Sequence, residues 1–147
     1  MLKNLKIDND KLLFENKKGY YSFDLSAIDV IDYFGFSLNF KFFNGRIYVA
    51  NYDDRKHLER DFQKLVKLLS AENEFCQCDE NIIINLSNVN EISTRIDDDG
   101  INCNLVLQFE NFKREIAFPD AEDVQKAKQK VERSLEELNN INSQVQQ

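Results

Sequence analysis

Glycine and proline are scarce in this sequence, with four Gly and one Pro among 147 residues. Four glycines leave little room for the glycine-rich loops that hold the phosphate groups of nucleotide cofactors. The Gly-x-Ser-x-Gly segment typical of many serine hydrolases is missing as well. We therefore expect neither a bound cofactor nor an enzymatic activity.

Side chains that bind transition metals are also few. The single histidine, His57, is distant in the sequence from the three cysteines, Cys76, Cys78 and Cys103. A Cys-x-Cys spacing is tighter than the knuckles of structural zinc sites. Because the cysteines share the alternation of the neighbouring apolar residues, we predict buried thiols and no metal site.

Long apolar runs are absent too. Ile82-Ile83-Ile84 is far too short to cross a bilayer, and the first residues lack the apolar segment of a secretory signal. An odd, sparse set of cysteines is typical of a reducing compartment. We expect a cytoplasmic protein without a membrane partner.

Positively charged residues are fewer than negatively charged ones, and the imbalance differs between the two halves of the chain. The formal net charge is −7; residues 1–70 carry 12 Lys and Arg against 10 Asp and Glu, whereas residues 71–147 carry 7 against 16. An acidic surface repels the phosphate backbone of nucleic acids and suits a basic protein partner. Composition therefore favours a protein partner over nucleic acid.

The most informative feature that is present is a repeated stretch. Residues 24–31 (DLSAIDVI) recur in pattern 61 positions later as residues 85–92 (NLSNVNEI). Their apolar residues are spaced by three, which does not fit the two-residue alternation of a regular strand. Each copy is predicted to be a short turn between two strands, and the chain is predicted to be an internal duplication.

The residues after each copy also match. Alternating apolar positions predict strands in both halves, at Leu38, Phe40 and Phe42 and again at Leu105, Leu107 and Phe109. Asn44-Gly45 predicts a hairpin in the first half. Amphipathic helices follow, with N-caps expected at Asp53-Asp54 and at Asp120.

The predicted fold class is α+β, built from two copies of a β-β-β(-β)-α unit in which an antiparallel meander precedes one amphipathic helix. The first repeat spans residues 1–70 and the second residues 71–147, with a frayed polar tail from about residue 140. Because residues 71–80 lack Gly and Pro, we expect one compact unit with a pseudo-twofold axis between the repeats.

This order of elements resembles the four-strands-then-helix duplications of the PUR-repeat and Whirly families. The resemblance covers most of the chain, but it is one of element order and includes no specific motif. It implies binding of single-stranded nucleic acid on a sheet, and the negative charge of this chain departs from those families.

Residues 38–52 place apolar side chains on both faces of the predicted sheet. One face is predicted to hold Phe40, Phe42, Ile47 and Val49. The other is predicted to hold Phe43, Tyr48 and Tyr52. Since one helix covers one face, the second aromatic face can meet the other repeat, a second copy in a homodimer, a protein partner or stacked bases.

Two groups of carboxylates form the second candidate site. Asp97, Asp98 and Asp99 precede Gly100 at a predicted hairpin tip, but they lack the alternating ligands of a calcium loop. Asp120, Glu122 and Asp123 lie in the first turn of the predicted second helix. We predict that these six residues contact a basic partner.

The function expected from the sequence is therefore macromolecular binding without catalysis. The main hypothesis is an acidic adaptor or inhibitor, such as phages and mobile elements encode, that occupies a basic or nucleic-acid-binding surface of its target. The alternative hypothesis is a single-stranded nucleic-acid-binding protein that uses the aromatic sheet face.

Overall fold

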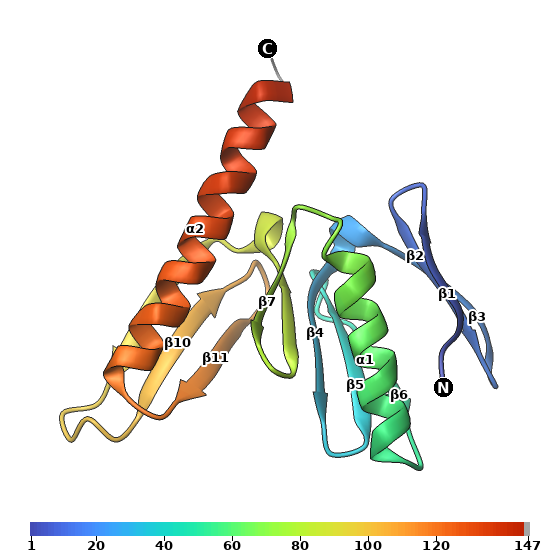
Figure 1. Cartoon of the computed structure of the whole chain (residues 1–147), viewed down its shortest axis with the longest axis horizontal. Helices are drawn as coiled ribbons and strands as arrows, with labels where there is room; N and C mark the ends of the chain where they lie inside the picture. The colour runs from blue at the N-terminus through green and yellow to red at the C-terminus, as the bar shows by residue number, and fades with distance from the viewer. Residues whose placement is uncertain (146–147) are drawn as a thin grey trace. The chain divides into compact units, whose positions relative to one another are not determined.

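The computed structural model describes residues 1–145, and within them the chain has an α+β fold with eleven β-strands and two α-helices (Figure 1). The predicted fold class is confirmed. The chain forms two compact units, unit 1 at Met1–Asn85 and unit 2 from Leu86 onward. In the described part, no helix is both long and apolar enough to cross a membrane.

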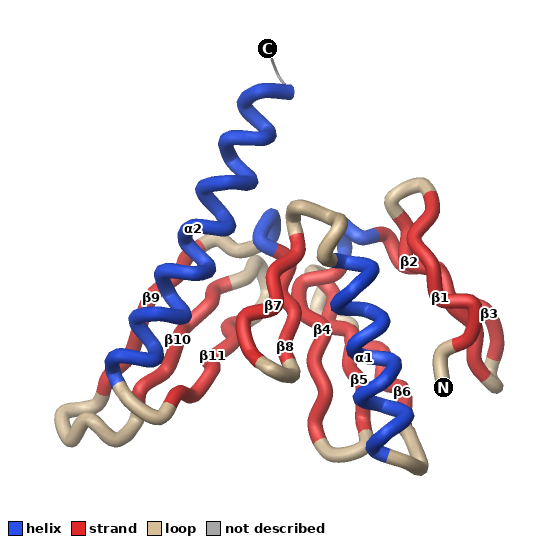
Figure 2. The backbone as a smooth tube through the Cα atoms, viewed as in Figure 1, coloured by secondary structure: helices blue, strands red, loops and turns tan. Residues whose placement is uncertain are grey.

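Unit 1 contains two antiparallel sheets and one helix (Figure 2). The first sheet is a meander of β1 (Lys3–Asp8), β2 (Lys11–Asn16) and β3 (Gly19–Asp24). The second has the strand order β6-β5-β4-β8-β7. Its strands are β4 (Ile28–Phe34), β5 (Ser37–Phe42), β6 (Ile47–Asn51), β7 (Phe75–Asp79) and β8 (Ile82–Asn85). Helix α1 (Arg55–Leu69) connects β6 to β7.

Unit 2 is a three-stranded antiparallel meander followed by a long helix. The strands are β9 (Glu91–Ile96), β10 (Cys103–Gln108) and β11 (Lys113–Phe118), and the helix is α2 (Ala121–Val145). Buried side chains of β10 alternate along the strand and pack against the apolar stripe of α2, as the two-residue and 3.6-residue periods require.

Helix α2 is longer than the sequence suggested. A frayed tail was predicted from about residue 140, but the helix continues to Val145, and residues 146–147 lie outside the described part of the chain. Leu138, near the predicted start of that tail, is buried. The polar residues that follow do not end the helix, because Asn and Gln are weaker helix formers but not helix breakers.

The repeated stretch forms the same structure in both places. Leu25–Ala27 and Leu86–Asn88 are short 3₁₀ turns between two strands, as predicted. The order of two strands, turn, three strands and helix also recurs along the chain. The compact units nevertheless divide after Asn85 rather than after residue 70, because β8 pairs with β4 in one sheet. The duplication itself and its pseudo-twofold axis stay predictions.

The core of unit 1 is formed by the first sheet and α1 on the same face of the five-stranded sheet. Phe14 of β2 stacks on Phe40 of β5 with ring centroids 5.7 Å apart, and Phe23 of β3 lies 5.5 Å from Phe40. Further along that face, Tyr33 of β4 meets Phe62 of α1 at 4.8 Å. One face of the large sheet is thus covered by two different elements.

The register of the β5–β6 hairpin corrects the predicted faces. A two-residue Asn44-Gly45 loop would pair Phe43 with Arg46, but the N–H of Phe42 donates to the carbonyl of Arg46, so three residues form the loop. Gly45 takes the positive φ of 86° that such loops need at their last residue. Even-numbered residues therefore keep the same face across the hairpin.

Tyr48 consequently pairs with Phe40, on the buried face, and the assignment of Tyr48 and Tyr52 to a second, open face was wrong. Ile47 and Val49, which were expected beside Phe40, are instead 58% and 43% exposed. Tyr48, the aromatic residue of β6, packs against Phe14, Tyr21 and Phe23 of the three-stranded sheet in the same unit. Tyr52, just beyond β6, is buried and bonds Asp61 of α1.

A buried carboxylate joins three separate segments of unit 1. Asp61 of α1 is 2% exposed, and its Oδ2 accepts the backbone N–H of Leu2 at 2.9 Å and the hydroxyl of Tyr52 at 2.7 Å. Its Oδ1 lies 3.9 Å from Nζ of Lys64. Because hydrogen bonds to a charged acceptor are stronger than neutral ones, this group anchors the N-terminal strand and the end of β6 to α1.

Loss of this carboxylate should destabilise unit 1 strongly. In Asp61→Ala the Leu2 N–H and the Tyr52 hydroxyl lose their acceptor in a buried site, so we expect the free energy of unfolding to fall by roughly 3 kcal/mol. Urea denaturation followed by circular dichroism measures this change. The control is Glu59→Ala, which removes an exposed ion pair with Arg55 and should cost about 0.5 kcal/mol or less. Equal effects of the two changes would contradict the anchoring role of Asp61.

The same site predicts a loss of stability in alkaline solution. Burial, and then the hydrogen bond to Asp61, raise the pKa of the Tyr52 hydroxyl above its ordinary value. An unfolded chain releases this proton above pH about 10 while the folded chain holds it, so stability falls as pH rises beyond that value. Tyr52→Phe should be less stable than wild type at pH 8, and the gap should narrow by pH 11 in thermal melts. Two curves that stay parallel from pH 8 to 11 would exclude this contribution.

Candidate functional site

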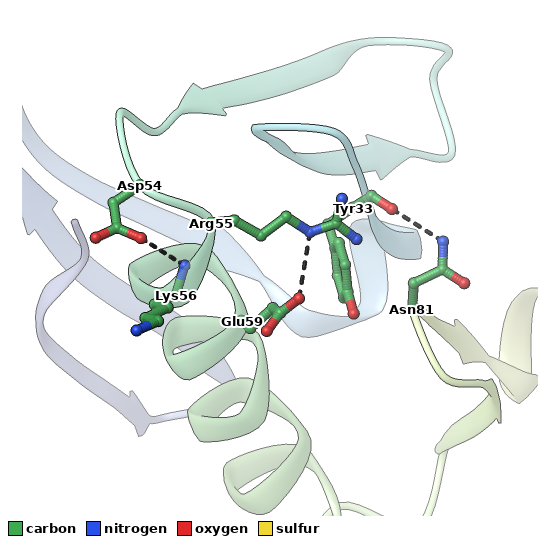
Figure 3. A network of polar contacts seen from close by, with 6 residues as sticks. All are labelled: Tyr33, Asp54, Arg55, Lys56, Glu59 and Asn81. Carbon is green, nitrogen blue, oxygen red and sulfur yellow. Dashed lines mark hydrogen bonds and ion pairs between the residues drawn. The ribbon is translucent and has the colours of Figure 1, made fainter.

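Helix α1 begins with a defined cap and a small polar network (Figure 3). Asp54 accepts the backbone N–H of Lys56 at 2.7 Å, so the predicted cap at Asp53-Asp54 is confirmed at Asp54. The guanidinium of Arg55 lies 3.2 Å from Glu59 and 5.6 Å from the ring centre of Tyr33. These contacts hold the first turn of the helix in place, and they engage the guanidinium of Arg55 with Glu59 and Tyr33.

One side of the exposed face of α1 is cationic. Lys56, Arg60, Lys64 and Lys67 are all exposed and follow one another at spacings of four, four and three residues, which places them on one side of the helix. We call these four residues the α1 stripe. At about 1.5 Å per residue it extends over about 16 Å. Its charges face solvent because Leu58, Phe62, Leu65 and Leu69 occupy the buried side.

A groove of about 640 Å³ lies at the start of this helix. His57, Asp53 and Asp54 line it from the α1 end, and Lys3, Lys17 and Lys18 line it from the three-stranded sheet. Lys17 and Lys18 form the tip of the β2–β3 hairpin, where Asn16 accepts the N–H of Lys18 at 2.8 Å. The groove thus has lysines on the side of the three-stranded sheet and two carboxylates at the start of α1, and none of the α1 stripe residues lines it.

The predicted aromatic site residues have other roles in the structure. Tyr52 is 7% exposed and bonds Asp61, and Tyr48 is partly buried with its hydroxyl 2.6 Å from Nδ2 of Asn16. Burial, and then the hydrogen bond with Tyr21, raise the pKa of Tyr48 to about 12. Phe43 is 49% exposed at the β5–β6 turn. The three residues do not form a common stacking face, which also removes the face that was offered to a homodimer.

The predicted acidic residues are brought to one end of unit 2. Cys103 pairs with Ile96 on one side and with Phe118 on the other, so the β9–β10 loop and the start of α2 lie at the same end of the sheet. This end holds Asp97, Asp98, Asp99, Asp120, Glu122 and Asp123. The register therefore places the two groups of carboxylates at the same end of the sheet, and their contact with a basic partner stays a prediction.

Several of these carboxylates stabilise the local backbone. Asp99 accepts the N–H of Ile101 at 2.9 Å, and Asp97 accepts the side-chain amide of Asn102 at 2.8 Å. Asp120 accepts the N–H of Asp123 at 2.8 Å, as expected of the N-cap of α2. Their presence therefore has a structural reason that is independent of any partner.

The cysteines and histidine are dispersed. The side chains of Cys76, Cys78 and Cys103 are buried, as predicted. In the part of the chain that the structure describes, no three His, Cys, Asp or Glu side chains are grouped so that they could hold a metal ion. His57 lies 3.6 Å from Asp54 at the start of α1.

The sequence reasoning missed two functional candidates, the α1 stripe and Tyr20. The stripe has a clear signal, since its four cations recur at helical spacing opposite the apolar residues. Tyr20 is 88% exposed because β3 turns Tyr21 and Phe23 toward the core and every other side chain outward. The sequence signal for Tyr20 is the alternation of residues 20–24, which we interpreted only as evidence for a strand.

Comparison with known proteins adds a likeness of fold. No family model and no curated protein matches this sequence. Among solved structures, the chain is similar to the LytTr DNA-binding domain of a methyl-accepting/DNA response regulator from Bacillus cereus. The TM-score is 0.51 at 12% sequence identity, and the match covers 82% of this chain and 97% of that domain. At this identity the likeness is one of fold.

Proposed function

We propose that unit 1 binds nucleic acid, with the α1 stripe as its contact to the phosphate backbone. The observation that carries this proposal is the set of four exposed cations on one side of α1, in a chain whose net charge is −7. Lysine and arginine side chains along a helix can each neutralise a phosphate and release its counterions. The proposed role is binding without catalysis.

The negative net charge does not oppose this role at the stripe itself. At an ionic strength of 0.1 M, exposed charges more than about 10 Å apart are largely screened. A phosphate at α1 therefore responds mainly to the charges near it, which are the four cations of the stripe together with Glu59 and Glu80, the carboxylates that line one hollow with Lys56 and Arg60. At longer range the negative net charge repels an approaching nucleic acid. We therefore expect binding only in the orientation in which α1 faces the nucleic acid.

The fold likeness supports the same proposal. The similar solved domain is described as DNA-binding, and the match covers nearly the whole length of that domain. A shared fold does not by itself transfer a function, so the proposal depends on the charges of this chain. The earlier preference for a protein partner rested on net charge, which does not report how the charges are distributed.

Removal of the stripe should weaken binding and its dependence on salt. The triple variant Lys56→Gln/Arg60→Gln/Lys67→Gln leaves Lys64, which lies near Asp61, in place. We expect at least tenfold weaker binding of a labelled DNA duplex, and a slope of log affinity against log salt that is smaller by roughly 2 to 3. Fluorescence anisotropy from 50 to 200 mM salt measures both quantities.

Helix α2 provides a matched control. Lys126, Arg133 and Lys130 are exposed on that helix at spacings of four and three residues. The variant Lys126→Gln/Lys130→Gln/Arg133→Gln removes the same charge from unit 2 and should bind the duplex as wild type does. The proposal fails if wild type binds neither duplex nor single strand at low salt, or if both triple variants lose affinity equally.

The acidic adaptor or inhibitor is the second candidate function. It is favoured by the six carboxylates that share one end of unit 2. Two results together would select this function. Wild type would bind no nucleic acid, and it would bind a basic protein partner that the variant Asp98→Asn/Glu122→Gln no longer binds. Neither residue caps a helix or closes the β9–β10 loop, so the variant should keep the fold.

A further inference from the structure

The outer face of the three-stranded sheet in unit 1 carries side chains in rows across the strands. The register aligns Lys3 with Glu15 and Glu15 with Tyr20 in one row. In the next row it aligns Lys6 with Leu13 and Leu13 with Ser22. These two rows border the β2–β3 hairpin tip, where Lys17 and Lys18 are located.

A hollow of about 630 Å³ opens at these rows. Tyr20 lines it with a side chain that is 88% exposed, and Leu13 is half-buried beside it. Asn4 also lines it, held to the carboxylate of Glu15 by a hydrogen bond from its amide. The hollow therefore combines an open aromatic ring, an apolar neighbour and polar groups at its margin.

A bulge in β1 gives this site its polar margin. The β1–β2 register shifts between Lys3 and Lys6, and Asn4 has a positive φ of 54°. A bulge redirects a side chain that a regular strand would place elsewhere, and positive φ is unfavourable for residues other than Gly and tolerated best by Asn and Asp. Here it sets the Asn4 amide against Glu15, next to Tyr20 across the sheet.

Charge indicates the kind of ligand. Lys6 lines the hollow together with Tyr20, and Glu15 is the only carboxylate among the residues that line it. Lys17 and Lys18 lie at the hairpin tip, three and two residues before Tyr20 in the chain, and they line the neighbouring groove. An exposed aromatic ring among lysines is complementary to a base whose backbone carries phosphates. A purely apolar ligand would leave these lysines without a role.

We infer that this hollow binds an unpaired nucleobase, which stacks on Tyr20 while the adjoining phosphates lie at Lys17 and Lys18. The inference rests on the proposed nucleic-acid binding and adds a preference for single strands. In a duplex both faces of a base are covered by its neighbours, so only an unpaired base can offer a face to Tyr20. Stacking is tolerant of base identity, so we expect weak sequence preference.

The test compares a labelled 12-nucleotide thymidine oligomer with a labelled duplex by fluorescence anisotropy. Tyr20→Ala should bind the oligomer about tenfold more weakly, as expected for the loss of one stacking contact, while duplex affinity stays within about twofold. Tyr20→Phe keeps the ring and should bind the oligomer as wild type does. Because Tyr20 is on the surface, thermal melts of both variants should match wild type.

Phe43→Ala supplies the matched control, since Phe43 is a half-exposed aromatic residue at the β5–β6 turn. It should leave affinity for the oligomer unchanged. As a direct readout, photocrosslinking of a 5-bromouracil-substituted oligomer followed by peptide mass analysis should label Tyr20.

The outcomes separate this inference from the proposed function. Unchanged oligomer affinity in Tyr20→Ala, or crosslinks that map away from residues 3–22, would overturn the Tyr20 site and leave the α1 stripe standing. Equal loss of oligomer and duplex in Tyr20→Ala would also overturn the single-strand preference. If wild type binds neither ligand at low salt, the proposed function fails and the inference fails with it.

Discussion

One buried carboxylate determines how the cationic parts of unit 1 are arranged. Asp61 accepts hydrogen bonds from Leu2 and from Tyr52, and it lies 3.9 Å from Lys64, a member of the α1 stripe on the same helix. The N-terminal strand, the end of β6 and α1 are thereby fixed to one another. The groove between Lys3, Lys17 and the start of α1 exists because these segments are held in place. A buried charge is costly unless it is satisfied, so the arrangement is well specified.

The distribution of charge matters more for binding than its sum. Unit 2 gathers six carboxylates at one end of its sheet, whereas the exposed side of α1 in unit 1 carries four cations. Each group acts over about a Debye length, so a single chain can present a cationic and an acidic surface at physiological salt. Net charge alone favoured a basic protein partner, and it could not detect the α1 stripe.

The hairpin loop between β5 and β6 shows how one residue changes a functional interpretation. With a two-residue loop, Tyr48 and Tyr52 would form an open aromatic face; with the observed three-residue loop they join the core. A shift of register by one residue moves every side chain of a strand to the other face. Asn44-Gly45 signalled a hairpin correctly, but the dipeptide does not determine the loop length. Among the described residues the most exposed aromatic side chain is Tyr20, at 88%, on a different sheet.

The sequence by itself determined much of the local structure of this protein: the strands that follow each repeated stretch, the two amphipathic helices, the caps at Asp54 and Asp120, and the turns at Leu25–Ala27 and Leu86–Asn88. These depend on neighbouring residues, and periodicity reports them directly. Only the tertiary structure decided that β8 joins the sheet of β4, that Tyr52 bonds Asp61, and that Tyr20 stays exposed at a hollow that Lys6 also lines. Those contacts join residues far apart in the chain, and their choice depends on register and on packing, which local patterns do not encode.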